Sequence, residues 1–162
     1  MLYKEIEEYA EALLFARKAI ADAVRNKRAQ QKAERLDFLF RDGRFDPTAN
    51  KVIKDMTPIA VVSCCHLGQT FLVYRPEDWL DTMKKAFVLF RQRFSGKAYR
   101  TIQHRYLWEW SVTKCVVTEG IAKRTYQTRR TEFLHGYVML AIQAGLVEID
   151  ASVDTLKKLN RE

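Results

Sequence analysis

The sequence predicts an all-α protein in which a helical N-terminal region precedes a C-terminal helix-turn-helix. Three observations lead to this fold class. Apolar residues recur at helical spacing in several long segments. Only 6 Gly and 3 Pro occur among 162 residues, so few turns interrupt the chain. Residues 98–142 contain two apolar-periodic segments joined at a Glu119-Gly120 turn, and the second segment opens with basic residues.

The N-terminal region, residues 1–95, begins with a long helix or a helical hairpin over residues 3–39. Apolar residues from Ile6 to Val24 share one helical face. A turn cluster follows at residues 41–47. A helix of this length needs an apolar partner, so we expect it to pack against a later helix or a second subunit.

Residues 56–74 allow two interpretations. Their Val and Ile content favours extended chain, but periodicity does not distinguish this from a short buried helix. The following segment, residues 76–94, is clearly helical, because Pro76 suits the first helical position. Apolar and aromatic residues from Trp79 to Phe94 recur about one turn apart, which we interpret as a core or interface stripe.

The helix-turn-helix domain is expected over residues 96–145. A helix at about 98–108 leads into it. The second helix of the motif should end near Gly145, because glycine is favoured just past a helix C-terminus. Residues 146–162 are then a C-terminal tail, in which a short helix at 153–160 is expected.

The second helix of the motif carries the candidate DNA-binding residues. A recognition helix needs short polar side chains that reach base edges and cations that contact phosphates or guanines. The candidates are Lys123, Arg124, Thr125, Gln127, Thr128, Arg129 and Arg130. We expect the two threonines and the glutamine to face base edges, and the four cations to contact the DNA backbone or guanine. An ordinary amphipathic helix with a solvated basic face is the alternative.

The distribution of charge favours DNA as the partner. The net charge is +8, and residues 96–145 contain 8 basic and 3 acidic residues, whereas residues 1–55 contain 12 and 10. The excess positive charge therefore lies on the helix-turn-helix segment. There it would attract a polyanion and release counterions on contact, whereas a dispersed charge would indicate only a solvated surface.

Other kinds of site have little support in the sequence. A Gly-rich phosphate loop, a Ser/His/Asp arrangement and a pair of catalytic carboxylates are all missing, so we expect no enzyme. Glu7 and Glu11 lie one turn apart near Lys4, which is typical of surface ion pairs. The Cys64-Cys65-His66 cluster contains adjacent cysteines, which do not readily bind one ion. We expect no metal and no cofactor, and we interpret these cysteines as small buried apolar residues.

The same sequence features predict a cytoplasmic location. Three cysteines, an odd number, suit a reducing compartment better than a disulfide framework. The first residues carry acids and lack the basic stretch of a signal peptide. No segment approaches the roughly 18 apolar residues of a membrane span, so we expect no membrane contact.

Three short motifs carry a resemblance to a known family. They are Arg105-Tyr106-Leu107, Gly120-Ile121 and Lys123-Arg124-Thr125-Tyr126. In this order they resemble the C-terminal region of the ArpU/RinA-type transcriptional regulators of bacteriophages, which is itself similar to region four of bacterial sigma factors. The motifs match that family's first helix, its turn and the start of its recognition helix. The resemblance covers about 45 of the 162 residues.

The sequence departs from the family pattern at three positions around the turn. Glu119 stands where leucine is usual, Val116 where alanine is usual, and Ala122 where serine is usual. The last change removes a side-chain cap that contributes about 1 kcal/mol to a helix in general. These changes bear on how the two helices of the motif cross.

The resemblance implies control of phage late genes, such as packaging, structural and lysis genes. We therefore expect a sequence-specific transcriptional regulator, most simply an activator, that binds double-stranded DNA and has host RNA polymerase as a second candidate partner. Two alternatives stay open. One is a DNA-packaging subunit like a phage small terminase, which forms rings, and the other is a sigma-like factor that acts mainly through RNA polymerase.

The sequence also raises the question of a homodimer. The apolar stripe from Ile6 to Val24 and the aromatic stripe from Trp79 to Phe94 are too large for a 50-residue domain to cover. They could cover each other within one chain. We favour a symmetric dimer, because it would place two recognition helices on a two-fold operator.

Overall fold

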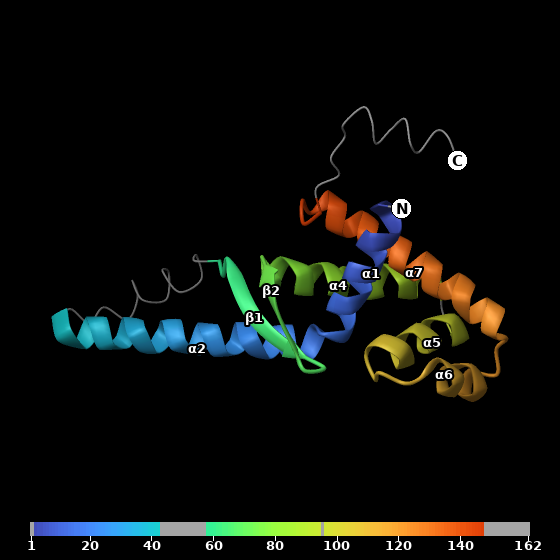
Figure 1. The fold of residues 1–162 in the computed structure, drawn as a ribbon, viewed down its shortest axis with the longest axis horizontal. Coiled ribbons are helices and arrows are strands. Elements are labelled where there is room, and N and C mark those ends of the chain that lie inside the picture. The colour runs from blue at the N-terminus through green and yellow to red at the C-terminus, as the bar shows by residue number, and fades with distance from the viewer. Residues whose placement is uncertain (1, 43–57, 95, 148–162) are drawn as a thin grey trace, which may run out of the picture.

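The computed structural model describes residues 2–42, 58–94 and 96–147. Within these ranges the chain forms six helices and one β-hairpin (Figure 1). The elements are α1 (Leu2–Phe15), α2 (Arg17–Asp42), β1 (Val61–His66), β2 (Gln69–Tyr74), α4 (Pro76–Arg93), α5 (Lys97–Tyr106), α6 (Val112–Glu119) and α7 (Lys123–Gln143). The prediction of a mostly helical protein is therefore confirmed, and the hairpin is the departure from an all-α fold.

The predicted N-terminal helical segment is two successive helices, α1 and α2, that meet at Ala16. Hydrogen bonds continue across this point, since the Ala16 amide donates to Ala12 and the Ile20 amide donates to Ala16, at 3.0 and 2.9 Å. The buried residues around the junction of the two helices are Ala10, Leu13, Leu14, Ala16 and Ile20, and none of the described side chains of α2 after Ile20 is buried. The middle of α2 still packs on β1, and its Arg28 pairs with Glu77 of α4 at 2.8 Å, whereas the C-terminal part of α2 extends away from the other helices (Figure 1). Most of the predicted turn at 41–47 lies outside the described residues.

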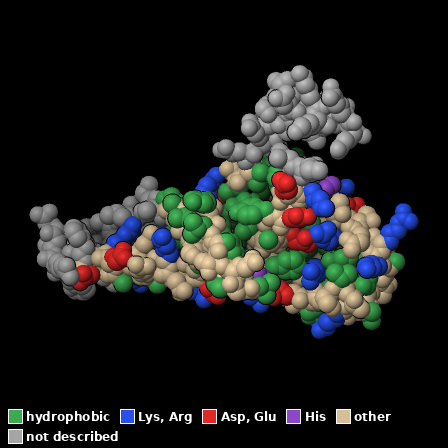
Figure 2. All heavy atoms as spheres, viewed as in Figure 1, with side chains coloured by type: hydrophobic (Ala, Val, Ile, Leu, Met, Phe, Trp, Pro, Cys, Tyr) green, Lys and Arg blue, Asp and Glu red, His purple; other side chains and the backbone are tan. Residues whose placement is uncertain are grey.

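The ambiguous segment at 56–74 contains the hairpin. β1 and β2 are antiparallel, with Val62 opposite Val73, and the strands join through Leu67 and Gly68, both with positive φ. A two-residue turn with positive φ matches the twist of paired strands. Side chains alternate, so that Val62 and Val73 are buried while Leu72 is exposed. Figure 2 shows hydrophobic side chains on the outer surface of this hairpin.

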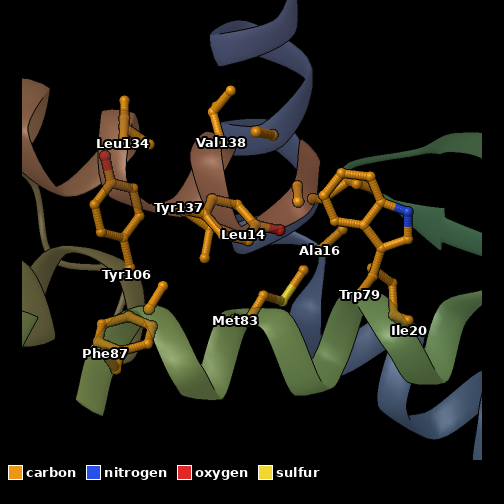
Figure 3. Packing of buried hydrophobic residues seen from close by; sticks show 14 of the residues in the cluster. Leu14, Ala16, Ile20, Trp79, Met83, Phe87, Tyr106, Leu134, Tyr137 and Val138 are labelled. Carbon is orange, nitrogen blue, oxygen red and sulfur yellow. The ribbon is translucent and has the colours of Figure 1, made fainter. Parts of the chain in front are cut away.

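The core lies between α1, α4 and α7 (Figure 3). The predicted aromatic stripe of α4 faces α7, with Trp79 6.0 Å from Tyr137 and Phe87 4.9 Å from Phe133 between ring centroids. α7 also packs against α1. Both apolar stripes are thus buried within one chain. A second copy is not required to cover these stripes, so their size no longer supports a homodimer. The homodimer stays a prediction.

Arg75 joins the beginning of α4 to the end of α7. It precedes Pro76, which opens α4 as predicted, and has a left-handed backbone with φ 51°. Its guanidinium donates to the Gly145 and Ala144 carbonyls at 2.9 and 3.2 Å, and to Asp78 at 2.8 Å. Gly145, with φ 64°, follows the last turn of α7, as predicted for the end of this helix.

Two further expectations concern the C-terminus and the membrane. Leu146 and Val147 pack against the core, whereas the predicted helix at 153–160 lies outside the described residues. Among the helices of the described residues, none is long and apolar enough to cross a bilayer.

Candidate nucleic-acid interface

The predicted turn between two short segments is present as the α6–α7 connection. The Ser111 hydroxyl caps α6 by accepting a hydrogen bond from the Lys114 amide at 3.2 Å. Gly120 ends α6 with a left-handed backbone, at φ 59° and ψ 47°. The Ile121 amide donates back to Val116 at 3.1 Å. This left-handed residue reverses the chain direction sharply, so that α7 begins at Lys123.

Five of the seven predicted DNA-binding residues are exposed at the start of α7. We call them the α7 N-terminal surface: Lys123, Arg124, Thr125, Gln127 and Thr128. At about 100° per residue, the first two and the last two of these five lie within an arc of about 140° on one side of the helix. Tyr126, on the other side, is buried and holds this end of the helix to the rest of the chain.

The other two predicted residues, Arg129 and Arg130, are engaged within the molecule. The Arg129 guanidinium pairs with Glu132 at 2.7 Å and lies 4.6 Å from the centroid of the Phe94 ring. Arg130 forms a two-point ion pair with the Glu11 carboxylate of α1. The four predicted cations thus divide into an exposed pair, Lys123 and Arg124, and a pair that packs against α1 and α4.

Glu11 is the centre of a polar cluster that the sequence does not reveal. It accepts hydrogen bonds from Arg130 and from the Tyr106 hydroxyl, the latter at 2.6 Å, and its side chain is 16% exposed. Burial alone would raise the pKa of the Glu11 carboxyl, but these hydrogen bonds and the charges of Arg130 and Arg105 outweigh it and lower that pKa. Burial also raises the pKa of the Tyr106 hydroxyl above its usual range.

The expectation of surface ion pairs at Glu7 and Glu11 is therefore wrong for Glu11. Glu7 also turns toward α7, where it pairs with His135 at 2.7 Å, and Lys4 pairs with Glu8 instead. The helical spacing of these carboxylates was visible in the sequence. Their partners were not, because they come from α5 and α7, which lie far along the chain: Tyr106 is 95 residues after Glu11, and Arg130 is 119 residues after it.

A second polar cluster joins α6 to α5. Arg100 and His104 of α5 face the carboxylate of Glu119, the last residue of α6. The His104 ring contacts both Trp108 and Trp110, with centroid distances of 4.4 and 4.3 Å, and the two indole rings also contact each other at 5.4 Å. Sequence reasoning missed this cluster, although Glu119 was noted as a departure from the family pattern.

The cysteines divide between core and surface. Cys64 and Cys115 are buried, and burial raises the pKa of both thiols, whereas Cys65 is exposed. The interpretation as buried residues thus holds for Cys64 and is wrong for Cys65. Within the described ranges, no group of three or more His, Cys, Asp or Glu side chains is arranged to hold a metal ion.

Further Lys and Arg side chains lie near the α7 N-terminal surface. Figure 2 shows Lys and Arg side chains spread over the end of the molecule formed by α5, α6 and the start of α7. Lys97, Arg100 and Lys114 are also exposed on α5 and α6. A polyanion that contacts the α7 N-terminal surface would meet this broader positive region as well.

The first turn of α7 leads to a stability prediction. Ala122 occupies the N-cap position with an extended backbone and makes no side-chain cap. Ala122→Ser should raise the free energy of unfolding by about 1 kcal/mol, because the new hydroxyl can accept a first-turn N–H. Urea denaturation measures this change. Ala122→Val supplies no oxygen and is the control, so equal effects of the two substitutions would contradict the capping argument.

Comparison with known proteins gave no match, whether with family models, curated sequences or solved structures.

Proposed function

We propose that this protein binds double-stranded DNA through the α7 N-terminal surface and acts as a sequence-specific transcriptional regulator. In this proposal α6 and α7 form a helix-turn-helix, and α7 is the recognition helix. The observation that carries the proposal is the composition of that surface. Two cations and three hydrogen-bonding side chains are all exposed in the first two turns of a long helix.

The anchoring of α7 supports this role. A recognition helix must be held rigidly from behind while its N-terminal end enters the major groove. α7 meets this requirement, because five side chains in its later turns are buried in the core: Phe133, Leu134, Tyr137, Val138 and Ala141. Its first turns lie at the opposite end of the helix from the C-terminal tail, beside α6 (Figure 1).

The chemistry of the exposed residues fits duplex DNA. Gln127 offers the donor and acceptor pair that recognises adenine, and threonine hydroxyls can bond to several base edges. Lys123 and Arg124 suit phosphates or guanine. The N-terminus of α7 adds a partial positive charge and free backbone N–H groups, which favour a phosphate there.

The more specific form of the proposal comes from the motifs around the turn. Their resemblance to ArpU/RinA-type regulators supports control of phage late genes, with host RNA polymerase as a second partner. The exposed pair Lys123-Arg124 belongs to the motif that carries this resemblance.

Selection of binding sites from a random duplex pool, followed by titration, tests the proposal. The protein should enrich a discrete sequence and bind it at least about 10³-fold more tightly than random DNA at physiological salt. Absence of enrichment, together with equal binding to all duplexes, would overturn sequence-specific recognition.

Gln127→Ala separates base reading from backbone contact. We expect this substitution to lower discrimination at one base pair by about 1–3 kcal/mol, while affinity for random DNA stays nearly unchanged. Gln143→Ala is the matched control, because Gln143 is exposed on the same helix about 24 Å further along its axis. Equal losses on selected and random DNA would count against base reading by Gln127.

A further inference from the structure

Glu119 is a buried acid at an unfavourable position. Its side chain is only 7% exposed, and it is the last residue of α6. A carboxylate near a helix C-terminus is repelled by the negative end of the helix dipole, and burying it removes its hydration. Such a residue is stable there only when specific partners compensate, so those partners indicate what Glu119 does.

Within the described residues, the side chains that face the Glu119 carboxylate are Arg100 and His104, and both lie on α5. The Nε atom of Arg100 lies 3.2 and 3.1 Å from the two carboxylate oxygens, and its Nη2 atom lies 3.1 Å from Oε2. The Nδ1 atom of His104 lies 3.6 Å from Oε1 and makes no hydrogen bond. Arg100 therefore holds the carboxylate by hydrogen bonds, and the His104 ring lies beside it one turn further along α5.

The histidine is itself held in place by the loop between α5 and α6. Its ring stacks on Trp108 and makes a tilted contact with Trp110, and these two indole rings also touch each other, with centroids 5.4 Å apart. The Lys114 ammonium of α6 lies 4.0 Å from the Trp110 ring centroid. The Trp110 amide donates to the His104 carbonyl at 3.0 Å. The loop and α6 are therefore fastened to α5 by polar and aromatic contacts.

Apolar packing contributes little to the position of α6. Cys115 and Glu119 are its only fully buried residues, whereas α7 buries six. α6 packs against α5, and α7 begins at Lys123, four residues after Glu119. The Glu119 ion pair thus fixes the point from which the α7 N-terminal surface begins.

We propose that Glu119 is a positioning residue, which through Arg100 and His104 holds α6 and the Gly120 turn in the orientation that DNA binding requires. This inference rests on the proposed function for its DNA readout. It also has a consequence that does not involve DNA, namely that α6 should loosen selectively when the ion pair is removed.

In the DNA-binding test, the charge effect and the positioning effect of removing Glu119 change the affinity in opposite directions. Removing an acid from a DNA-binding face should by charge alone strengthen binding to a polyanion. If Glu119 positions the interface, Glu119→Ala should instead weaken binding to the selected duplex by about tenfold, within the range seen for residues of one coupled network. Glu34→Ala on α2 removes one exposed acid and is the matched control, with unchanged or slightly tighter binding expected.

Two conservative variants keep the test independent of misfolding. Glu119→Gln retains an oxygen that can accept from Arg100, so it should keep most of the affinity. Glu119→Leu replaces the carboxylate with an apolar group of similar size and can preserve stability, since buried ion pairs are often replaceable in this way. It should still weaken DNA binding, because Arg100 and His104 lose the group that they hold. Full affinity of a stably folded Glu119→Leu protein would overturn the proposal.

Arg100 requires a separate experiment, because its side chain is half exposed and could contact a phosphate directly. A lost phosphate contact would lower the slope of log affinity against log salt by about 0.9, whereas a lost positioning contact would leave the slope unchanged. We expect Arg100→Ala to weaken binding without changing the slope, and the double variant with Glu119→Ala to lose no more affinity than either single variant. A reduced slope together with additive losses would assign Arg100 to DNA and contradict the positioning role.

Hydrogen exchange distinguishes failure of this inference from failure of the proposed function. In Glu119→Ala, the amides of residues 112–120 should exchange at least about tenfold faster, while those of residues 133–141 stay protected. This measurement uses the free protein. Faster exchange in a chain that binds no DNA would support the positioning role and overturn the function, whereas unchanged exchange in α6 would overturn the positioning role.

Discussion

Glu11→Ala should lower the free energy of unfolding by about 2–3 kcal/mol, the largest stability effect that we expect from losing one ion pair in the described residues. Removing one member of a buried ion pair leaves the other charge uncompensated, and full burial would raise the cost to about 3–5 kcal/mol. Here the Arg130 side chain is 31% exposed, which reduces that cost. The Tyr106 hydroxyl also loses its acceptor. Urea denaturation followed by circular dichroism measures the change.

Glu8→Ala is the matched control for this prediction. Glu8 lies on the same helix but is exposed, and its ion pair with Lys4 spans 3.9 Å at the surface. Such pairs contribute about 0–1 kcal/mol, so the substitution should change stability by less than about 0.5 kcal/mol. Similar effects of the two substitutions would show that the Glu11 cluster does not stabilise the junction of α1 with α7.

The same cluster makes stability depend on pH in a defined direction. The folded chain lowers the pKa of the Glu11 carboxyl below its unfolded value of about 4.3. Its contribution is therefore complete above that value and is lost as the pH falls through the lower, folded pKa. We expect the difference in stability between the natural protein and Glu11→Gln to be constant at neutral pH and to shrink at acid pH. A difference that grows on acidification would contradict this assignment.

Lys123→Ala combined with Arg124→Ala should cause the largest loss of DNA affinity. If each cation contacts one phosphate, the salt slope should fall by about 1.8, and affinity at 0.1 M salt should fall by about 50-fold. Fluorescence anisotropy with a labelled duplex, repeated at several salt concentrations, measures both quantities. The fold should be unaffected, because both side chains are exposed.

The control for this double substitution removes the same charge elsewhere. Lys18 and Lys32 are exposed on α2, so replacing both by alanine also lowers the net charge by two. The salt slope should then stay the same, and affinity should change by less than about threefold. Equal slopes and equal losses for the two double variants would mean that DNA responds only to net charge, and the α7 N-terminal surface would lose its assigned role.

Arg129 and Arg130 show how tertiary contacts divide residues that look equivalent in the sequence. All four cations of residues 123–130 were predicted to face DNA, because they cluster at the start of one basic helix. Helical periodicity places Arg130 near the buried side of α7, but it does not predict which group Arg130 contacts on that side. That group is Glu11, 119 residues earlier in the chain.

The hairpin shows a second limit of prediction from sequence, which concerns the type of secondary structure. Residues 61–74 are short, apolar and bounded by no decisive signal, and such a segment can be buried equally well as a strand or as a helix. Pairing between Val62 and Val73 and packing of β1 on α2 decide the outcome. Backbone hydrogen bonds between strands are non-local, so the preference of either strand alone does not reveal them.

The sequence by itself determined the helix at about 76–94, a basic helix that opens near Lys123 and ends near Gly145, the Gly120 turn, the uncapped start of that basic helix and the concentration of positive charge on residues 96–145. These features depend on contacts within about four residues and on composition, which are local properties. Only the tertiary structure decided that both apolar stripes close within one chain, that Arg130 pairs with Glu11, and that Glu119 is buried against Arg100 and His104. Each of these brings together residues from separate elements, so burial and charge pairing acquire their partners only once the chain has folded.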